Sequence, residues 1–258
     1  MQKFTEKITF VKNGRGIWDL DPFKGCEDGI KNNPNGCYGL CYAAKSAKIR
    51  GFDFSKTVYR YFENEKQIKK IGKKLQQTSF IDGVCPKFIR LGVMCDPSFD
   101  WGHTIRIIDK IKKYNTNIVI ITKHWKSLND NQLEYIKNLK NIYINTSISA
   151  LDTNDQIKHR LKQYNTLKKY CFSVLRVNTA DFNDQKLRKI QKELLENESV
   201  IDNILRINPC HHLVQNNIVN IKKYKFINNE VWASKFNKDT YFGTCDNCPE
   251  QCGVNLFN

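Results

Sequence analysis

The amino-acid sequence predicts an α/β fold, with parallel strands in a partial (β/α)6 barrel and a small C-terminal cap rich in cysteine. Two observations lead to this fold class. Short apolar, β-branched runs alternate with longer amphipathic stretches, which is typical of right-handed βαβ units around a parallel sheet. About six such units fit between residues 16 and 208, which is too few for a closed eight-stranded barrel and suits an open, partial one.

The expected strands are short and apolar, and the expected helices carry apolar residues on one face. In the stretch 101–114, Ile105, Ile108 and Ile111 recur at a spacing that keeps them on one side of a helix. The expected strands, in chain order, are 16–20, 88–94, 118–122, 141–149, 171–178 and 203–208. The expected helices are 43–50, 101–114, one that begins at 127–130, 152–170 and 184–198.

The pattern changes after Cys210. Two short strands are expected there, at 218–221 and 224–227, and a cysteine-rich segment follows them. We therefore divide the chain into a barrel domain, residues 1–208, and a C-terminal cap, residues 209–258.

The composition favours a protein of the reducing cytoplasm. The 258 residues contain ten cysteines, and the first eleven residues lack the apolar segment of a signal peptide. Thiols stay free in reducing compartments, so metal ligation is favoured over disulfides, which remain the alternative. No run of 18 or more apolar residues is present, so neither a transmembrane helix nor a membrane partner is expected.

The formal net charge of +16 invites a nucleic-acid partner. The same charge has a plainer explanation, because the chain is rich in Lys, Asn, Ile, Tyr and Phe, as expected of an AT-rich genome. Many lysines, Lys69 and Lys70 among them, also fall on the expected solvent faces of helices. Charge alone leaves both explanations open.

Polar residues follow the expected strands at the ends where parallel sheets place functional groups. The first strand leads into a loop with Cys26, Cys37 and Cys41. The later strands end in Cys95, Asp96 and Ser98; Thr122, Lys123 and His124; Asn145, Thr146, Ser147 and Ser149; Arg176 and Asn178; and Arg206 and Asn208. Since six strand ends would meet at one rim, the sequence predicts a ligand site there.

The loop with three cysteines is the most informative stretch of the chain. Its glycines allow the backbone to fold around a metal, so that the three thiolates can converge on one centre. Three cysteine ligands rather than four would leave one metal position open for chemistry, and this predicts a metalloenzyme. A structural zinc site, which Cys95 could complete in space, is the alternative.

The words GCYGLCYA, GVMCDPS and ITKHW, at residues 36–43, 92–98 and 121–125, resemble radical S-adenosylmethionine enzymes, and most closely their phage-type and photolyase-like members. The resemblance covers roughly residues 16 to 208. It implies a [4Fe–4S] cluster on three cysteines, with S-adenosylmethionine on the open iron. Reductive cleavage would then give a 5′-deoxyadenosyl radical that abstracts hydrogen from a substrate. The spacing here, C-x10-C-x3-C, departs from the common C-x3-C-x2-C.

The resemblance also implies roles for single residues. Cys26, Cys37 and Cys41 would hold the cluster, and Tyr42 or Leu40 would lie near the adenine. The loop with Asp96 and Ser98 would meet the methionine ammonium, with Asp96 as the contact. Ser147 and Ser149 would meet the ribose or the carboxylate, Arg176 the carboxylate and Asn178 the ribose.

Plainer roles stand beside these. Asp96 could cap a helix, and Arg176 could form an ion pair. Cys95 could donate a hydrogen atom to a substrate radical or form a covalent adduct, or it could be a small buried hydrophobic residue.

A second cluster of cysteines lies near the C-terminus: Cys245, Cys248 and Cys252. The C-x2-C spacing places two sulfurs on one side of a tight turn, which is a frequent metal-binding motif. Cys210 is the expected fourth ligand, and His211 or His212 is the next candidate. The expected metal is a second [4Fe–4S] cluster or zinc.

The sequence therefore predicts a radical S-adenosylmethionine enzyme that receives electrons from an external donor. A nucleic acid base or nucleotide is the leading substrate, and a peptide or small metabolite comes second. A non-catalytic zinc protein that binds nucleic acid is the rival, and an iron–sulfur electron carrier is a third possibility.

Overall fold

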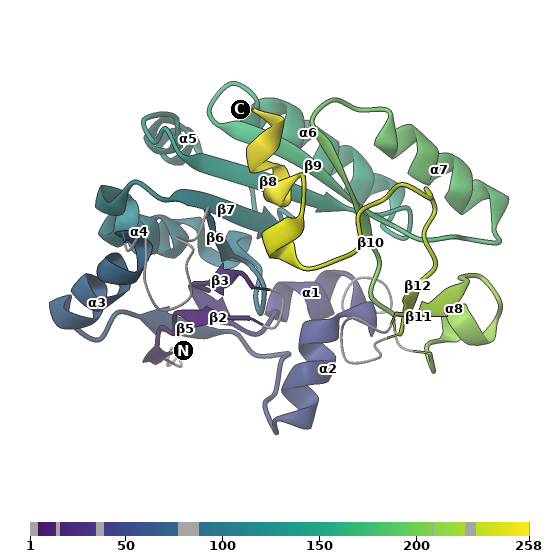
Figure 1. The fold of residues 1–258 in the computed structure, drawn as a ribbon, viewed down its shortest axis with the longest axis horizontal. Helices are drawn as coiled ribbons and strands as arrows, with labels where there is room; N and C mark the ends of the chain where they lie inside the picture. Colours follow the sequence, from purple (N-terminus) through teal and green to yellow (C-terminus); the bar gives the residue numbers. More distant parts are fainter. Residues whose placement is uncertain are drawn as a thin grey trace.

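Six parallel strands run through the centre of the computed structural model, which describes residues 5–13, 16–34, 39–76, 88–207, 209–224 and 231–257 (Figure 1). Their order in the sheet is β10-β9-β8-β7-β6-β3, and β2 (Val11–Lys12) pairs antiparallel to β3 at the edge. Their bounds are β3 Trp18–Asp19, β6 Phe88–Leu91, β7 Asn117–Thr122, β8 Ile142–Ile148, β9 Phe172–Thr179 and β10 Val200–Ile204. The predicted α/β fold with a parallel sheet is confirmed.

The helices that connect these strands begin at capping side chains. Each cap accepts a hydrogen bond from a backbone N–H of the first turn, which would otherwise have no partner. The caps are Asn129 for α5 (Asp130–Lys137), Thr153 for α6 (Asn154–Leu167) and Asp184 for α7 (Gln185–Leu195). In α5 and α6 a glutamine in the first turn completes a capping box.

The helix expected at 101–114 is α4 (Trp101–Ile111), preceded by the 3₁₀ turn η2 (Pro97–Asp100) and extended by η3 (Lys112–Tyr114). None of the described helices is both long and apolar enough to cross a membrane.

A second, smaller sheet combines the N-terminal strand β1 with two strands from the chain segment between β3 and β6, a segment where the sequence analysis expects only the helix 43–50. Its strands are β1 (Thr5–Lys7), β5 (Val58–Tyr61) and β4 (Phe23–Lys24). The same region contains the helices α1 (Glu27–Asn32), α2 (Tyr42–Ile49) and α3 (Glu65–Gln76). The first βα unit is therefore longer than expected, because strands of two to four residues give little periodic signal.

Two strands differ from their expected bounds. β6 ends at Leu91 rather than at residue 94, because Gly92 has a φ of 98° and turns the chain away from the sheet. β10 spans Val200–Ile204 rather than 203–208, since its register with β9 pairs Val200 with Leu175 and Ile204 with Thr179.

After β10 the chain forms α8 (His212–Gln215), β11 (Ile221–Lys223), β12 (Val231–Ala233), η4 (Cys245–Asn247) and η5 (Gln251–Leu256). The strand expected at 218–221 begins only at Ile221, and most of the one expected at 224–227 lies outside the described residues. β12, which pairs antiparallel with β11, is not expected from the sequence. The division into domains 1–208 and 209–258 stays a prediction.

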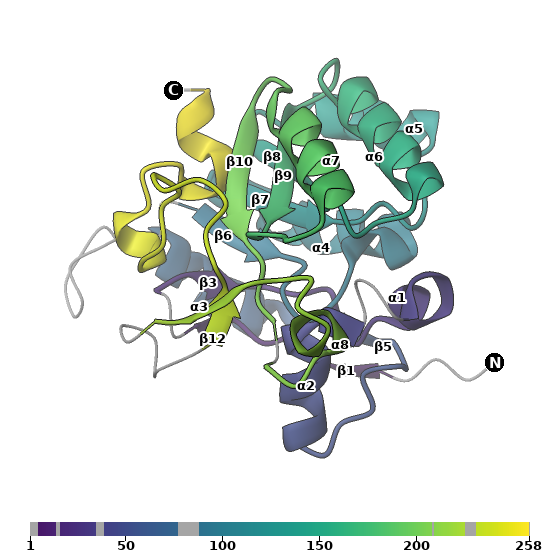
Figure 2. The same cartoon turned by 90° about the vertical axis from the view of Figure 1, so that its right-hand side faces the viewer.

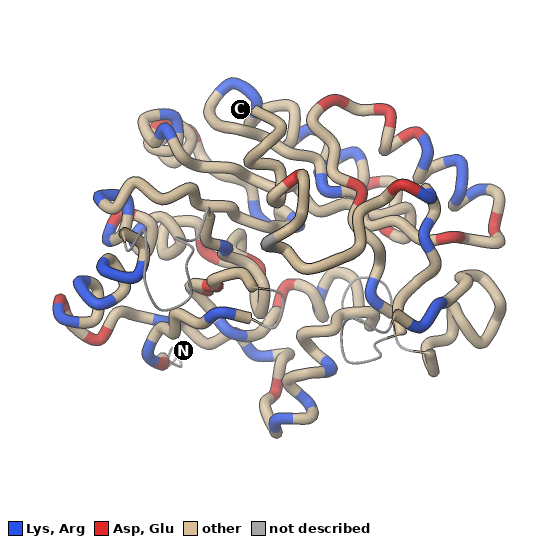
Figure 3. Tube along the Cα trace, in the orientation of Figure 1, with Lys and Arg blue, Asp and Glu red and all other residues tan. Residues whose placement is uncertain are grey.

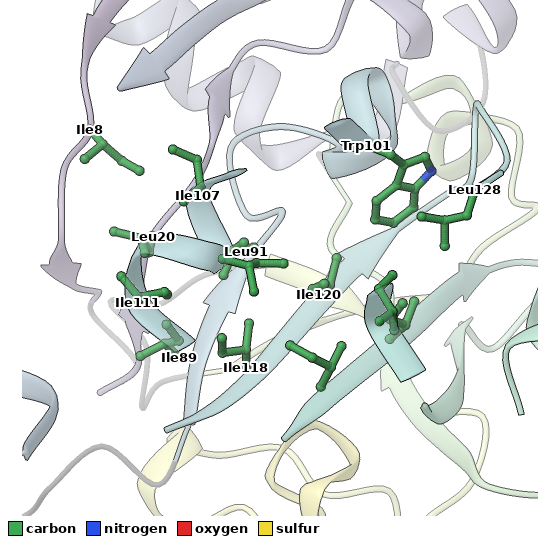
Figure 4. Close-up of a cluster of buried hydrophobic side chains, with 14 of the residues drawn as sticks. Ile8, Leu20, Ile89, Leu91, Trp101, Ile107, Ile111, Ile118, Ile120 and Leu128 are labelled. Carbon is green, nitrogen blue, oxygen red and sulfur yellow. The ribbon is translucent and has the colours of Figure 1, made fainter. Parts of the chain in front are cut away.

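The main hydrophobic core lies between the sheet and its helices (Figure 4). Side chains alternate between the two faces of a strand. In β6, Ile89 and Leu91 therefore pack in this core with Ile107 of α4. Phe88 lies on the other face, in a cluster with Cys252 and Val254 of η5.

The C-terminal segment thus covers the face of the sheet that the helices leave open. Figure 2 shows this segment and the helices α6 and α7 on opposite sides of the sheet. Asn145 of β8 donates a hydrogen bond from Nδ2 to the backbone oxygen of Cys252 at 3.1 Å. Only part of this face is covered, and the remainder forms the wall of a cavity.

Candidate active site

A cavity of about 440 Å³ lies at the carboxyl ends of the parallel strands. Its lining includes most of the residues that the sequence analysis assigns to a cofactor. These are Cys26, Leu40, Cys41, Tyr42, Cys95, Asp96, Ser147, Ser149, Arg176 and Asn178. The expectation that strand ends from distant parts of the sequence meet at one rim agrees with this arrangement.

Two of the three cysteines of the first loop lie on the cavity wall. Cys26 follows Gly25, whose φ is 98° and whose position leaves no room for a Cβ atom, because Lys56 O would be 2.0 Å from it. Cys41 stands at the N-cap of α2, where the helix dipole stabilises a thiolate. Cys37 lies outside the described residues.

The donors on this wall fit a shared metal centre, because two thiols separated by fourteen residues open onto the same cavity. Among the residues that the structure describes, no group of three or more Cys, His, Asp or Glu side chains is arranged to hold a metal ion. Since Cys37 is not described, the predicted cluster ligands stay a prediction.

The loop after β6 is held by an aspartate that the sequence analysis does not single out. Asp21 is buried and accepts hydrogen bonds from the backbone N–H groups of Gly92, Val93 and Met94 at 2.7, 2.9 and 2.8 Å. Burial, together with the neighbouring Asp19, raises the pKa of Asp21. The available signal was an acidic residue directly after the first expected strand.

Asp96 connects the loops after β6 and β7. Its Oδ1 accepts hydrogen bonds from the backbone and hydroxyl of Ser98 and from the hydroxyl of Thr122, at 2.9, 2.8 and 2.7 Å. Its Oδ2 accepts one from the backbone of Lys123 at 2.7 Å. The plainer expectation for Asp96, that it caps a helix, is confirmed, since it is the N-cap of η2.

Ser98 is fully buried behind Asp96 and is not among the residues that line the cavity. Its hydroxyl donates to Asp96 and accepts a hydrogen bond from the backbone of Trp125 at 2.9 Å. Ser98 therefore stabilises the loop after β6 rather than facing the cavity.

Strands β8, β9 and β10 contribute a connected row of polar side chains. Asn178 Nδ2 donates to Ser147 Oγ at 2.8 Å, and Asn178 Oδ1 accepts from Asn203 Nδ2 at 2.7 Å. Arg176 Nη2 donates to Asn203 Oδ1 at 2.5 Å. Asn203, which the sequence analysis places only in a strand, orients both predicted residues of β9.

Ser149, after β8, accepts a hydrogen bond from the backbone of Leu151 at 3.1 Å. It is buried and lines the cavity near Asp152.

Two cationic residues of the cavity wall are paired with carboxylates. Arg90 Nε lies 3.1 Å from Asp19 Oδ1, and both side chains are buried. Burial alone would lower the pKa of Arg90, but the negative charge of Asp19 raises it, so the guanidinium stays charged. Lys123 Nζ lies 3.3 Å from Asp152 Oδ2.

Cys95 lies on the cavity wall and packs against Phe23 and Tyr59. Burial raises the pKa of its thiol well above the ordinary value, and Asp21 adds to this effect. The thiol is therefore protonated at neutral pH. This state suits both expectations for Cys95, a hydrogen-atom donor and a buried hydrophobic residue.

Arg206 lies at the cavity wall between two aromatic rings. Its guanidinium carbon is 4.4 Å from the ring centre of Tyr42 and 4.6 Å from that of Trp232. Trp232 belongs to β12, and the two residues form an isolated antiparallel bridge. The sequence analysis places Arg206 among the strand-end residues but gives no sign of Trp232.

Two of the C-terminal cysteines, Cys245 and Cys252, pack on the face of the sheet that the helices leave open. Cys245 and Cys252 pack in one apolar cluster, and Arg176 Nη1 lies 3.9 Å from Cys252 Sγ. Burial raises the pKa of Cys248, whose thiol also interacts with that of Cys252. Among the described residues, however, these three thiols are not arranged as a group that could hold a metal ion.

Cys210, the expected fourth ligand, is exposed and directly precedes His211. A Cβ atom at Gly39 would lie 3.9 Å from Nε2 of His211. The segment with Cys210 therefore lies beside the first cysteine loop. The predicted ligand set of Cys210 with Cys245, Cys248 and Cys252 stays untested.

Among known structures, this fold is similar to that of spore photoproduct lyase. The match is to a double mutant with bound AdoMet and dinucleoside spore photoproduct. The TM-score is 0.53 at 11% sequence identity, and the match covers 88% of this chain and 72% of that chain. At this identity the similarity concerns the fold.

Two structures of SuiB from Streptococcus suis, one of them bound to S-adenosylmethionine, match less of the chain. Their TM-scores are 0.37 and 0.40 at 13% and 15% identity, over 53% and 64% of this chain. The chain spans 33% and 38% of these SuiB chains. No protein-family model and no curated protein sequence matches the chain.

Proposed function

We propose that this protein is a radical S-adenosylmethionine enzyme that acts on a nucleic acid base or nucleotide. The observation that carries the proposal is the cavity at the strand ends, where Cys26 and Cys41 share a wall with polar residues of five parallel strands. The similarity in fold to spore photoproduct lyase, which was solved with bound AdoMet, supports it. We infer an open, partial (β/α)6 barrel on the same grounds.

Cys26, Cys37 and Cys41 would hold a [4Fe–4S] cluster, with one iron left open for S-adenosylmethionine. When bound, the cluster would supply the electron that cleaves S-adenosylmethionine to a 5′-deoxyadenosyl radical, which abstracts hydrogen from the substrate. The electron would come from an external donor.

The polar residues of the cavity wall would orient S-adenosylmethionine. Oδ2 of Asp96 accepts one hydrogen bond and so retains capacity for the methionine ammonium. Arg176, whose guanidinium is positioned by Asn203, would bind the carboxylate. Ser147 and Asn178, which are hydrogen-bonded to each other, would bind the ribose hydroxyls.

The thiol of Cys95 would stay protonated beside the cofactor, because burial raises its pKa. A protonated thiol on the cavity wall can return a hydrogen atom to a substrate radical.

A polyanionic substrate is favoured by charge. The cavity is lined by Arg90, Lys123, Arg176 and Arg206, but only by the acids Asp96 and Asp152. The molecule as a whole carries a formal net charge of +16, and Figure 3 shows basic residues along most of the described chain. A nucleic acid would use both features.

We further propose that the C-terminal cap holds a second metal, a [4Fe–4S] cluster or zinc, on Cys245, Cys248 and Cys252. The C-x2-C spacing of Cys245 and Cys248 and the electrostatic interaction of Cys248 with Cys252 support this proposal. We place the enzyme in the cytoplasm, where the thiols would stay reduced.

The deciding experiment is anaerobic reconstitution followed by counts of iron, sulfide and zinc and by reduction with dithionite in the presence of S-adenosylmethionine. We expect about four to eight irons per chain and formation of 5′-deoxyadenosine. Cys41→Ala should lose about four irons and all cleavage, because it removes one thiolate from the catalytic cluster.

Cys171→Ala is the matched control. Cys171 packs beside the main core, and its thiol lies 3.8 Å from Leu167 O, away from the cavity. This variant should keep both iron and cleavage. Stoichiometric zinc without iron in the wild-type protein would contradict the proposal and favour a binding protein.

A further inference from the structure

Arg206 is held in a fixed position at the cavity wall. Its guanidinium lies between the rings of Tyr42 and Trp232, at 4.4 and 4.6 Å from their centres. Such contacts favour the cation and restrict its rotamers.

Both rings are themselves fixed. Tyr42 donates a hydrogen bond from its hydroxyl to the backbone oxygen of Val93 at 3.0 Å. Trp232 is buried and meets the ring of Phe242 edge-on, with ring centres 4.7 Å apart. The arginine is therefore pre-organised before any ligand binds, which reduces the entropic cost of binding.

The stacking also determines how Arg206 can bind a ligand. A guanidinium that stacks on aromatic rings donates its N–H hydrogen bonds at its edge, in its own plane. In that plane they form a fork that matches two oxygens of a phosphate or a carboxylate.

The charge of the neighbouring wall favours an anion there. Arg90 is paired with Asp19, and Lys123 and Arg160 share the carboxylate of Asp152. Arg176, by contrast, donates to Asn203 and lies near the thiol of Cys252, and no carboxylate in the described residues lies within ion-pair distance of it. The described lining of the whole cavity carries four cationic side chains, Arg90, Lys123, Arg176 and Arg206, against the two carboxylates of Asp96 and Asp152.

We propose that Arg206, clamped by Tyr42 and Trp232, binds a phosphate group of the nucleotide substrate. This inference rests on the proposed function and specifies how its substrate is recognised. A phosphodiester fits better than a peptide carboxylate, because the net charge of +16 would attract the remaining phosphates of a nucleic acid as well.

The test compares charged and neutral probes on the reconstituted protein, by anaerobic calorimetry with S-adenosylmethionine present and no reductant. The probes are the homodinucleotides of DNA and RNA, each paired with its methylphosphonate analogue, whose linkage has no charge. Arg206→Gln should weaken binding of the phosphate form by at least about tenfold and change the affinity for the neutral form by less than about twofold.

Two further variants test the clamp. Arg206→Lys keeps the charge and loses the fork, so it should lose most of the same affinity. Trp232→Leu removes one of the two ring contacts and should weaken binding of the phosphate form by about threefold or more, again with little effect on the neutral form.

Lys222→Gln is the matched control. It removes one charge from β11, where Lys222 is exposed and pairs with Trp232 across the strands, outside the cavity lining. It should leave both affinities unchanged. Thermal midpoints of all variants show whether they are folded.

Three outcomes would overturn the inference. The first is wild-type protein that binds charged and neutral probes equally. The second is an Arg206→Gln variant that binds both as the wild type does. The third is a loss of affinity for S-adenosylmethionine alone, which would assign Arg206 to the cofactor carboxylate. Absence of S-adenosylmethionine binding by the wild type would instead contradict the proposed function, whatever the dinucleotides do.

Discussion

At the scale of single residues, burial determines how several polar groups behave. His124 is buried in a left-handed conformation, with φ of 51°, and its Nε2 lies 3.0 Å from the hydroxyl of Thr146. Burial, with the nearby His159 and Arg160, lowers the pKa of His124 from 6.5 to about 3. The folded protein therefore keeps this imidazole neutral at pH values where the unfolded chain protonates it.

His124 should make the protein sensitive to acid. Its folded-state pKa lies below its unfolded value, so its contribution is complete above pH 6.5 and is lost as the pH falls from 6.5 towards 3. At about pH 4.5 the loss should be roughly 2–3 kcal/mol. Chemical denaturation at several pH values measures it.

His124→Asn is the informative variant, because asparagine tolerates a positive φ and does not titrate. Its free energy of unfolding should change less between pH 7 and pH 4.5 than that of the wild type. If both proteins lose stability in parallel, the imidazole is not the group responsible.

The residues of the cavity were predictable to different degrees. The rule that functional groups follow parallel strands found Asp96, Ser147, Arg176 and Asn178, because it needs only the strand ends. It missed Arg90, which lies inside β6 and faces the cavity through side-chain alternation. Trp232 could not be predicted, since its position depends on a bridge to Arg206 across the chain.

At the scale of the elements, two loops of the cavity depend on one carboxylate. Asp96 follows β6, while Thr122 and Lys123, which donate hydrogen bonds to it, end β7 and begin the next loop. The two strands are neighbours in the sheet. Asp96 therefore fixes the relative position of two adjacent loops and the cavity wall that they form.

Asp96→Ala should destabilise the protein by about 2–4 kcal/mol, because it leaves several buried donors without an acceptor. Denaturant titration measures this loss, and binding of S-adenosylmethionine should weaken with it. Asp239→Ala removes an exposed carboxylate and serves as the control, with no change expected. Equal effects of the two substitutions would mean that Asp96 does not join the loops.

Element boundaries show the limits of periodicity. Helices α4 to α7 lie close to their expected ranges because their apolar faces and caps are both visible in the sequence. The small sheet of β1, β5 and β4 was missed, as was β12, because each strand is too short to show alternation. The shift of β10 reflects pairing with β9, which a single sequence does not reveal.

At the scale of the whole molecule, the C-terminal segment is the cover of the sheet's second face. The segment packs tightly on β9 at Gly253, where φ is 92° and a Cβ atom would lie 2.5 Å from Cγ2 of Val174. Only glycine fits this position, both in conformation and in space.

Gly253→Ala should therefore loosen the segment and destabilise the protein by roughly 2–3 kcal/mol, from backbone strain and from overlap with Val174. Gly51→Ala is the matched control, since Gly51 has a φ of 67° but nothing within 4 Å of a Cβ. It should cost only about 1 kcal/mol. Limited proteolysis and thermal midpoints measure both effects.

A second substitution separates the two causes. Val174→Ala in the Gly253→Ala background should recover the share that is due to overlap, and a double-mutant cycle gives its size. Additive effects would show that the segment does not press on β9.

Several hydrogen bonds in and around the cavity join residues that are far apart in sequence, and this should affect the rate of folding. Asp21 binds residues about seventy positions later, Asn145 binds Cys252 over 107 positions, and Asn33 binds Gln156 over 123. The chain loses conformational entropy when such a loop closes, before the new contacts stabilise it. Folding is therefore slow when long-range contacts dominate. The pocket should be among the last parts of the molecule to mature during refolding, after the helices and the strand pairs that frame it.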